Sequence, residues 1–342
     1  MTVPSPEGEG TQGLTGFYLH PSGSLHDTGW GHPEHQGRLR ALASAVGREL
    51  PALHGRVVQR EPRSATEEEV LRVHTEEHVR RVRARVEEAG AQGRVLELEA
   101  DTRVSGDSWE AALGGAGGAL EAVEAVASGE LSNAFVATRP PGHHATPNRA
   151  MGFCLVNSVA VAARHLQARG LARRILVVDW DVHHGNGTQD TFYEDGSVFY
   201  LSLHQWPHYP GTGAAEEEGV GAGLGTTLNV PLPAGTPRPT YLERFREALE
   251  RAMRDFPPDF VLVSAGFDVL AGDPLGGQLL EPEDMATLTE MVLEVARKAC
   301  QGKVVALLEG GYDPGRTGQG AAQLLRALAG VPRTWGEAEG TL

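Results

Sequence analysis

The sequence predicts an α/β protein of three layers, α/β/α, in which helices cover both faces of a mostly parallel sheet of about eight strands. Three observations lead to this prediction. Short β-rich apolar runs alternate with longer segments of helical periodicity along the 342 residues. The run from Ile175 to Val178 is apolar throughout, as is typical of parallel strands buried on both faces. Ionisable residues follow directly after such runs, where open α/β sheets hold their sites.

The expected strands and helices follow one another along most of the chain. The strands are expected at residues 16–20, 56–60, 133–138, 174–181, 198–204, 227–232, 260–268 and 303–311. The helices are expected at residues 34–50, 66–90, 108–129, 157–169, 240–256, 282–301 and 318–329. Right-handed crossovers between parallel strands would bring the loops that follow the strands to one rim of the sheet.

No fixed-period repeat and no proline- or serine-rich linker divides the chain, so one domain is predicted over residues 14–335. Residues 1–13 and 336–342 are expected to be tails, the first being rich in glycine, proline and acid. The glycine-rich segment 114–118 lies inside a helical pattern, where small residues permit close packing. The other such segment, 219–225, is expected to be a long surface loop near the rim.

The composition narrows the classes of partner. A net charge of −15, from 45 acidic and 30 basic residues, argues against nucleic acid or an anionic membrane and favours cationic partners. The two cysteines, Cys154 and Cys300, are too few for a disulfide framework and are expected to be core thiols. Without a signal peptide or a membrane-spanning apolar run, the sequence predicts a soluble cytoplasmic protein.

The segment 179–189, DWDVHHGNGTQ, places two acids and two histidines directly after an apolar run. Ionisable groups are unfavourable inside a buried strand unless they are paired or bind a cation. Side chains two positions apart on an extended segment point the same way, so Asp179, Asp181 and His183 share one face. This arrangement is typical of metal ligands, whereas His184 is expected to point to the other side.

Three other expected strands also end in side chains that can take part in chemistry. His143 and His144 follow the strand at 133–138, Asp268 ends the run FVLVSAGFD, and Tyr312 follows KVVALLEGG. Because the ends of parallel strands share one rim, these residues are expected to meet there.

Two carboxylates and one imidazole around a divalent metal, with a position left for water and substrate, form a recognisable hydrolytic site. Asp181, His183 and Asp268 supply this set. A histidine beside the metal can take the proton of the attacking water, and a tyrosine hydroxyl can donate to the oxyanion of an amide carbonyl. The residues therefore favour a metal-dependent hydrolase.

A second histidine pair has weaker support as a metal site. His74 and His78 have the i, i+4 spacing at which two side chains on a helix can bind one metal. No third ligand accompanies them in the sequence. They are therefore expected on a partly exposed helix face.

Six motifs, in order and with matching spacing, resemble the histone deacetylase family, which has the arginase–deacetylase fold. They are RPPGHHA, GFCLVN, DWDVHHGNGTQ, YPGTG, SAGFD with DPLG, and EGGY. The resemblance covers roughly residues 16–330 and is closest to the class II type and its bacterial relatives. A set of six motifs is far more specific than any one of them.

The resemblance implies a role for each strand-end residue. The zinc ligands would be Asp181, His183 and Asp268, with ferrous iron as an alternative metal. Tyr312 corresponds to the tyrosine that polarises the carbonyl, His144 to the general base and acid, and His143 to its electrostatic partner.

Two further residues are implied as partners of the tandem histidines. Asp179 matches the carboxylate that orients His143. Asn186 stands where class I members have an aspartate, as in class II relatives, and it adds no charge. His144 is therefore expected to be less basic than in class I members.

The resemblance also implies a substrate tunnel. Gly152 matches the residue that contributes a carbonyl to the tunnel. Phe153 and Tyr209 match the two aromatic residues of its walls, and Leu275 lies at its mouth. Arg38 matches an arginine behind the site, in the acetate channel. The motif around it, HPEHQGR, lacks the usual second proline, so a different shape is expected for the entrance loop.

Structural monovalent cations are implied as well, with potassium as the expected ion. The first site corresponds to oxygens of Asp179, Asp181, His183, Ser202 and Leu203. Part of a second site corresponds to Phe192, Asp195 and Val198.

These inferences lead to a cytoplasmic metal-dependent deacetylase that acts on N-acetyl amides, with acetyl-lysine peptides or proteins as expected partners. One alternative is an amidohydrolase for acetylpolyamines or other acylated small amines. Another is an inactive reader of acyl-lysine, against which the intact His143, His144 and Tyr312 count. A two-manganese site like that of the arginase relatives is disfavoured, because Gly185 replaces a required aspartate. The sequence leaves the physiological substrate and the oligomeric state open.

Overall fold

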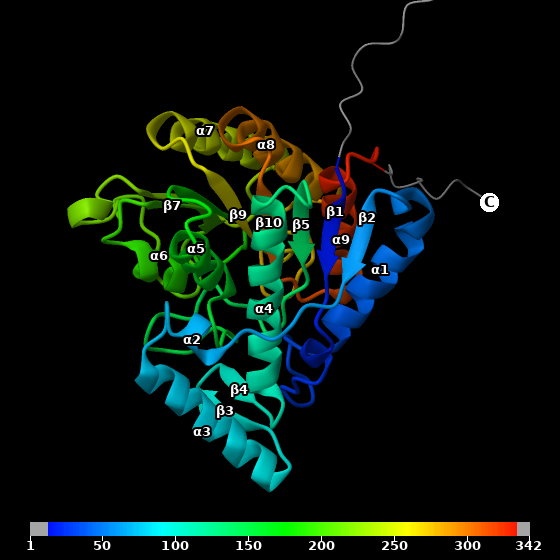
Figure 1. Ribbon diagram of the computed structural model, residues 1–342, viewed down its shortest axis with the longest axis vertical. Coiled ribbons are helices and arrows are strands. Elements are labelled where there is room, and N and C mark those ends of the chain that lie inside the picture. The colour runs from blue at the N-terminus through cyan, green and yellow to red at the C-terminus, as the bar shows by residue number, and fades with distance from the viewer. Residues whose placement is uncertain (1–12, 334–342) are drawn as a thin grey trace, which may run out of the picture.

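The computed structural model describes residues 13–333, and its centre is an eight-stranded sheet (Figure 1). The strand order is β2-β1-β5-β10-β9-β6-β7-β8, and every neighbouring pair is parallel. The strands are β1 (Thr15–Tyr18), β2 (Val57–Arg60), β5 (Asn133–Val136), β6 (Ile175–Asp179), β7 (Val198–Gln205), β8 (Thr227–Leu232), β9 (Phe260–Ala265) and β10 (Val304–Leu308). Each predicted strand is present.

Helices cover both faces of this sheet, so the predicted three-layer α/β/α arrangement is confirmed. One layer contains α1 (Gly37–Leu53), α7 (Arg238–Asp255), α8 (Pro282–Cys300) and α9 (Pro314–Leu328). The other contains α2 (Glu67–Val70), α3 (Glu76–Gln92), α4 (Ser108–Ala127) and α5 (Ser158–Ala168). Two short 3₁₀ helices, η1 (Pro21–Ser24) and η2 (Gly221–Gly223), lie in the connections.

The alternation of side chains along β6 explains why this strand is apolar throughout. Leu176 and Val178 pack into the core beneath the α1, α7, α8 and α9 layer, whereas Ile175 and Val177 pack into the opposite core. All four side chains are fully buried. Because both faces of the strand are covered, the polar side chains are displaced to its carboxyl end.

Three elements differ from the sequence prediction. The helix expected at 66–90 is two helices, because the side chain of Thr75 caps the first turn of α3 and restarts the helix there. The short helix α6 (Asn186–Phe192) was not among the predicted helices. The antiparallel hairpin of β3 (Leu96–Glu99) and β4 (Thr102–Val104) was not predicted.

The two glycine-rich segments have different outcomes. Close packing of α4 is confirmed, since a Cβ atom on Gly117 would lie 2.0 Å from the carbonyl oxygen of Arg63. The placement of segment 219–225 near the rim is wrong. This segment contacts Tyr193 and Asp195, which precede β7, so it lies at the amino ends of the strands.

The expectation that His74 and His78 lie on a partly exposed helix face is also wrong. Their side chains are only 2% and 1% exposed, and the two rings stack with centroids 4.6 Å apart. The backbone N–H of Asn157 donates to Nε2 of His74 at 2.9 Å, so Nδ1 carries the proton and donates to the Thr146 carbonyl at 3.0 Å. His78 donates to the carbonyl of Leu155 at 2.9 Å. The pair therefore fastens the segment between His144 and α5.

The cysteines, the helices and the ends of the described chain can also be compared with the sequence predictions. Cys154 and Cys300 are free and buried, as predicted. Within residues 13–333, no helix combines the length and the apolar composition needed to cross a bilayer. Apart from Gly13, the two expected tails lie outside the described residues. The predicted domain end at residue 335 also lies outside them.

Candidate metal centre and active site

Asp181, His183 and Asp268 meet at the carboxyl edge of the sheet. The first two follow β6 and the third follows β9, and these strands are neighbours with Asp179 opposite Ser264. Nδ1 of His183 lies 3.1 Å from a carboxylate oxygen of Asp181 and 3.3 Å from one of Asp268. One ligand atom from each residue lies within 4.8 Å of the others, and all three residues are buried. We call these residues the metal triad.

The charge balance of the metal triad fits a divalent cation. Burial alone would lower the pKa of His183, but the adjacent carboxylates of Asp181 and Asp268 raise it to about 10. Burial and the nearby Asp181 raise the pKa of Asp268 to about 7. The Oδ2 atom of Asp268 is buried and accepts no hydrogen bond from residues 13–333. Two buried carboxylates and one imidazole are a donor set that suits zinc or ferrous iron.

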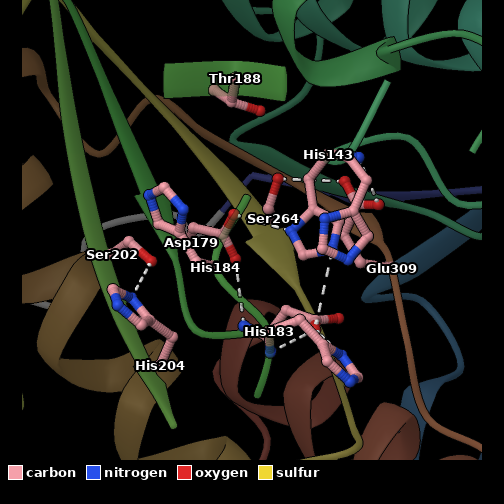
Figure 2. A network of polar contacts seen from close by, with 12 residues as sticks. His143, Asp179, His183, His184, Thr188, Ser202, His204, Ser264 and Glu309 are labelled. Atoms are coloured by element: carbon pink, nitrogen blue, oxygen red, sulfur yellow. Dashed lines mark hydrogen bonds and ion pairs between the residues drawn. The ribbon is translucent and has the colours of Figure 1, made fainter. Parts of the chain in front are cut away.

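His143 lies between the carboxylates of Asp179 and Asp181, and Figure 2 shows it with Asp179. Its Nδ1 lies 3.0 Å from Oδ2 of Asp179, which also accepts a hydrogen bond from the Tyr200 hydroxyl at 3.0 Å. Its Nε2 lies 3.7 Å from Asp181. Although burial opposes the charged form, Asp181 and Asp179 raise the pKa of His143 to about 10. His143 is therefore a fixed positive charge at neutral pH.

His144 has the opposite electrostatic character. Burial and the adjacent positive charges of His143 and His183 lower the pKa of His144 well below its usual range. Its Nδ1 lies 2.9 Å from Oδ1 of Asn186, which fixes the Nδ1–H tautomer and leaves the lone pair of Nε2. The neutral ring is a proton acceptor beside the metal triad, and Asn186 orients it without adding charge.

Glu309 was not recognised in the sequence, yet it positions the tandem histidines (Figure 2). It is 1% exposed, and its Oε2 accepts hydrogen bonds from the backbone N–H groups of Gly142 and His143 at 2.7 and 3.1 Å. Its Oε1 accepts from the hydroxyl of Ser264 at 3.0 Å. The sequence did contain a signal for its position at the sheet edge, because Glu309 directly follows the apolar run VVALL.

Tyr312 faces the metal triad from the end of β10, with Arg38 behind it. The guanidinium of Arg38 lies 5.0 Å from the centroid of the Tyr312 ring, and its Nε donates to the Gly311 carbonyl at 2.6 Å. Arg38 is fully buried and pairs with Glu34 at 3.0 Å. The backbone N–H of Tyr312 donates to Asp273 at 2.7 Å, which fixes the loop that carries the ring.

A cavity of about 540 Å³ leads from the surface to the metal triad, and we call it the tunnel. The predicted tunnel residues all line it, together with one metal ligand and two catalytic candidates: Gly152, Phe153, Tyr209, Leu275, His183, His144 and Tyr312. The Phe153 ring meets the Tyr312 ring edge-on at 5.7 Å, and the Tyr209 ring meets the His144 ring edge-on at 5.1 Å. The walls are therefore aromatic and suit a narrow apolar chain.

Asp101 and His208 are among the tunnel residues that were missed in the sequence. Asp101, in the unpredicted β3–β4 turn, accepts hydrogen bonds from the Tyr209 hydroxyl at 2.7 Å and from the Gly152 N–H at 3.2 Å. The alternation Leu-Glu-Leu-Glu before this turn was a hairpin signal. The ring of His208 stacks on that of His183 at 4.9 Å, and its Nε2 lies 2.9 Å from the Leu275 carbonyl.

His184 points away from the metal triad, as predicted. Its Nδ1 lies 2.8 Å from the Thr212 hydroxyl and its Nε2 lies 3.0 Å from the side-chain oxygen of Gln189. Burial and the nearby His204 lower its pKa well below the usual range. His184 is therefore a neutral member of a separate buried network.

The residues expected to bind monovalent cations lie at two ends of β7. At the carboxyl end, Ser202 lies opposite Asp179 in register, beside Leu203, and its hydroxyl lies 2.9 Å from Nδ1 of His204 (Figure 2). At the amino end, the Asp195 N–H donates to the Phe192 carbonyl at 2.9 Å, shortly before Val198. Both potassium sites stay predictions.

The surroundings of Gly185 bear on the two-manganese alternative. A Cβ atom at this position would lie 2.3 Å from Oδ2 of Asp179 and 2.5 Å from the Tyr200 hydroxyl. The position therefore has no room for the carboxylate that a second metal would need. The local packing supports a single-metal site.

The sequence of this chain is similar to those of known deacetylases. The profile of the histone deacetylase domain matches residues 32–328. A probable deacetylase of Archaeoglobus fulgidus is 40% identical over 300 residues, covering 88% of this chain and 82% of the relative. Histone deacetylase clr3 of Schizosaccharomyces pombe is 38% identical over 315 residues, covering 88% of this chain but only 45% of the relative.

A solved structure supports the same assignment. The crystal structure of the HDA15 HD domain superposes with a TM-score of 0.87 and 37% identity, covering 94% of this chain and 89% of that one. The parallel eight-stranded sheet with its flanking helices is the arginase–deacetylase fold. Together with the site at the carboxyl edge of the sheet, these matches place the chain in the histone deacetylase family.

Proposed function

We propose that the protein is a metal-dependent deacetylase that hydrolyses the N-acetyl amide of acetyl-lysine side chains to a free amine and acetate. The observation that carries the proposal is the metal triad at the inner end of the tunnel, with His144 and Tyr312 beside it. Membership of the histone deacetylase family supports the reaction class. Zinc is the proposed metal, with ferrous iron as the alternative.

The proposal gives each residue a step in the reaction. A metal held by the triad would supply Lewis acidity toward the amide carbonyl and the attacking water. His144 takes the proton of the water on Nε2 and later gives it to the leaving amine, while Asn186 holds its tautomer. Tyr312 donates its hydroxyl to the oxyanion. The positive charge of His143 stabilises negative charge that develops beside it.

The proposed substrate class follows from the tunnel mouth. Leu275 is half-buried there, with its carbonyl held by His208 and its N–H by Asp273. Leucine offers no partner to the distant ammonium of an acetylpolyamine, but it suits the methylene stem of lysine. The net charge of −15 attracts both substrates, so the local contact decides.

We therefore expect acetyl-lysine peptides to be better substrates than acetylspermidine, as measured by kcat/KM on one metal-loaded preparation. Leu275→Glu should shift the ratio toward acetylspermidine, because it adds a carboxylate at the mouth. Leu275→Gln is the matched control, since it has the same length as glutamate without the charge. A native preference for acetylspermidine, or an unchanged ratio in Leu275→Glu, would contradict the assignment of substrate.

The same assay separates the enzyme from an acyl-lysine reader. A reader would bind an acetyl-lysine peptide without releasing acetate, and it would need no proton shuttle. The neutral His144 and the protonated His143 support turnover. Binding without acetate release by the metal-loaded protein would favour the reader.

The structural potassium ions and the cytoplasmic location are also part of the proposal. Potassium would bind the oxygens near Asp179 and Ser202, whose strands lie side by side. The two free, buried thiols suit a reducing compartment. An increase in thermal stability with potassium, but not with an equal concentration of a larger organic cation, would support the first point.

A further prediction concerns Glu309. Glu309→Ala should lower kcat by on the order of 10²-fold, because the loop that carries His143 and His144 loses its support and small displacements of catalytic groups are costly. Glu309→Gln should restore most of the activity. Its amide oxygen can accept from both backbone N–H groups while its amide nitrogen donates to Ser264. Thermal melting of both variants controls for unfolding, and a Gln variant as impaired as the Ala variant would contradict this role.

A further inference from the structure

Trp30 is the most exposed large apolar residue within residues 13–333, with a relative exposure of 102%. It lies in the segment that joins η1 to α1, and we call residues 25–36 the mouth loop. A fully exposed tryptophan in a soluble protein needs an explanation, because its large ring is usually covered. The catalytic steps described above do not use it.

The mouth loop is firmly held, so the exposure of Trp30 does not follow from a loose segment. Thr28 donates its hydroxyl to the Glu34 carbonyl at 2.6 Å, and the Asp27 N–H donates to Ser105 at 3.0 Å. Glu34 is fully buried, and its carboxylate accepts from Arg139 at 2.8 Å and from a second buried arginine on α1. The indole is thus presented to solvent from an anchored base.

Contacts of the mouth loop place it at the tunnel mouth. The ring of His32 meets the ring of Phe153 edge-on, with centroids 4.8 Å apart, and Phe153 is a wall of the tunnel. Trp30 is two positions before His32, so their α carbons are at most about 7 Å apart. An occupant of the tunnel whose chain continues outside it would pass within reach of Trp30.

The occupant that fits is the peptide chain on either side of an acetyl-lysine. The side chain of the acetyl-lysine would fill the tunnel, so the backbone of the peptide would remain at its mouth. Because an extended chain spans about 3.5 Å per residue, the residues one or two positions from the acetyl-lysine would lie across the mouth. An indole on an anchored loop offers a large contact area, and because its side chain has only two torsions, fixing it costs little conformational entropy. Arg103 lies beside the loop, 3.4 Å from the Thr28 carbonyl, and the carboxylates of Asp27 and Asp101 lie on the same loop and tunnel, so neither sign of charge dominates there and an apolar side chain suits the indole.

We propose that Trp30 binds an apolar side chain next to acetyl-lysine and so makes extended peptides the preferred substrates. This inference rests on the proposed deacetylase function and deepens it. It distinguishes a peptide substrate from a single acetylated amine, which ends inside the tunnel or at its mouth and has no flanking residue to contact the indole.

The test compares three substrates: acetyl-lysine capped at both ends, a pentapeptide with leucine on both sides of acetyl-lysine, and the same pentapeptide with serine there. Trp30→Ala should lower kcat/KM for the leucine peptide by about tenfold, through KM, as expected for the loss of one aromatic contact. The loss should be within about twofold for the capped acetyl-lysine, and Trp30→Phe should keep most of the preference for leucine. Leu224→Ala is the control, because Leu224 is 68% exposed but precedes β8 at the opposite edge of the sheet.

Three results would overturn the inference. The first is an equal loss of kcat/KM in Trp30→Ala for all three substrates, and the second is no loss for the leucine peptide. The third is a dimer of the wild-type protein that Trp30→Ala converts to a monomer, because the indole would then bind a second copy of the chain. A wild-type protein that hydrolyses none of the three substrates would instead contradict the proposed function itself.

Discussion

Asp268→Ala is expected to lose the bound metal and with it all measurable turnover. Asp268 contributes a buried oxygen that forms no regular hydrogen bond within residues 13–333 and lies 3.3 Å from Nδ1 of His183, so a cation bound between the two could take both atoms as ligands. Alanine would leave Asp181 and His183 as a two-residue site, which is insufficient for tight binding of zinc. The same loss is expected for Asp181→Ala and His183→Ala, and elemental analysis of the purified proteins measures it.

Removal of any buried acid could disturb the site, so a control variant should lose a carboxylate that is not a proposed metal ligand. Glu309→Gln removes a carboxylate from the same rim and should retain the metal, because the contacts of Glu309 are to backbone N–H groups and Ser264. Thermal melting in the presence of a chelator distinguishes loss of metal from loss of fold. Full metal occupancy in all three alanine variants would rule out the assigned ligands.

The sequence was most informative where one physical constraint acted alone. A strand buried on both faces has no place for ionisable groups, so the acids and histidines after Val178 had to lie at the sheet edge. The parallel arrangement then brought Asp268 and Tyr312 to the same edge. The metal triad and its neighbours could therefore be predicted before any distance was known.

The sequence was less informative where tertiary contacts override local preference. His74 and His78 read as a helix face open to solvent, but they are buried because they fasten the backbone near Asn157. Asp101 lies in a short hairpin whose importance appears only when Tyr209, more than a hundred residues away, donates to it. Glu309 likewise acts on a loop from a distant part of the chain. No local pattern encodes such pairings.

Two tyrosine hydroxyls line the tunnel, and their different partners make the role of Tyr312 testable. The Tyr209 hydroxyl donates to Asp101 at 2.7 Å and is thereby committed to that carboxylate. Burial raises the pKa of Tyr312 well above its usual range, so its hydroxyl stays protonated and can act as a donor. Of these two hydroxyls, that of Tyr312 is therefore the one that we propose to stabilise the oxyanion.

Tyr312→Phe is therefore expected to lower kcat by on the order of 10²–10³, the usual cost of removing one oxyanion donor. The metal content and melting temperature should not change, because the ring keeps its contacts with Arg38 and Phe153 and its backbone N–H still donates to Asp273. Tyr209→Phe, the matched control, removes a hydroxyl from the same tunnel and should leave kcat within a few-fold of wild type, about the scale of one neutral hydrogen bond. Near-normal turnover of Tyr312→Phe would mean that another group stabilises the oxyanion, whereas an equal loss in both variants would mean that the hydroxyls act by shaping the tunnel.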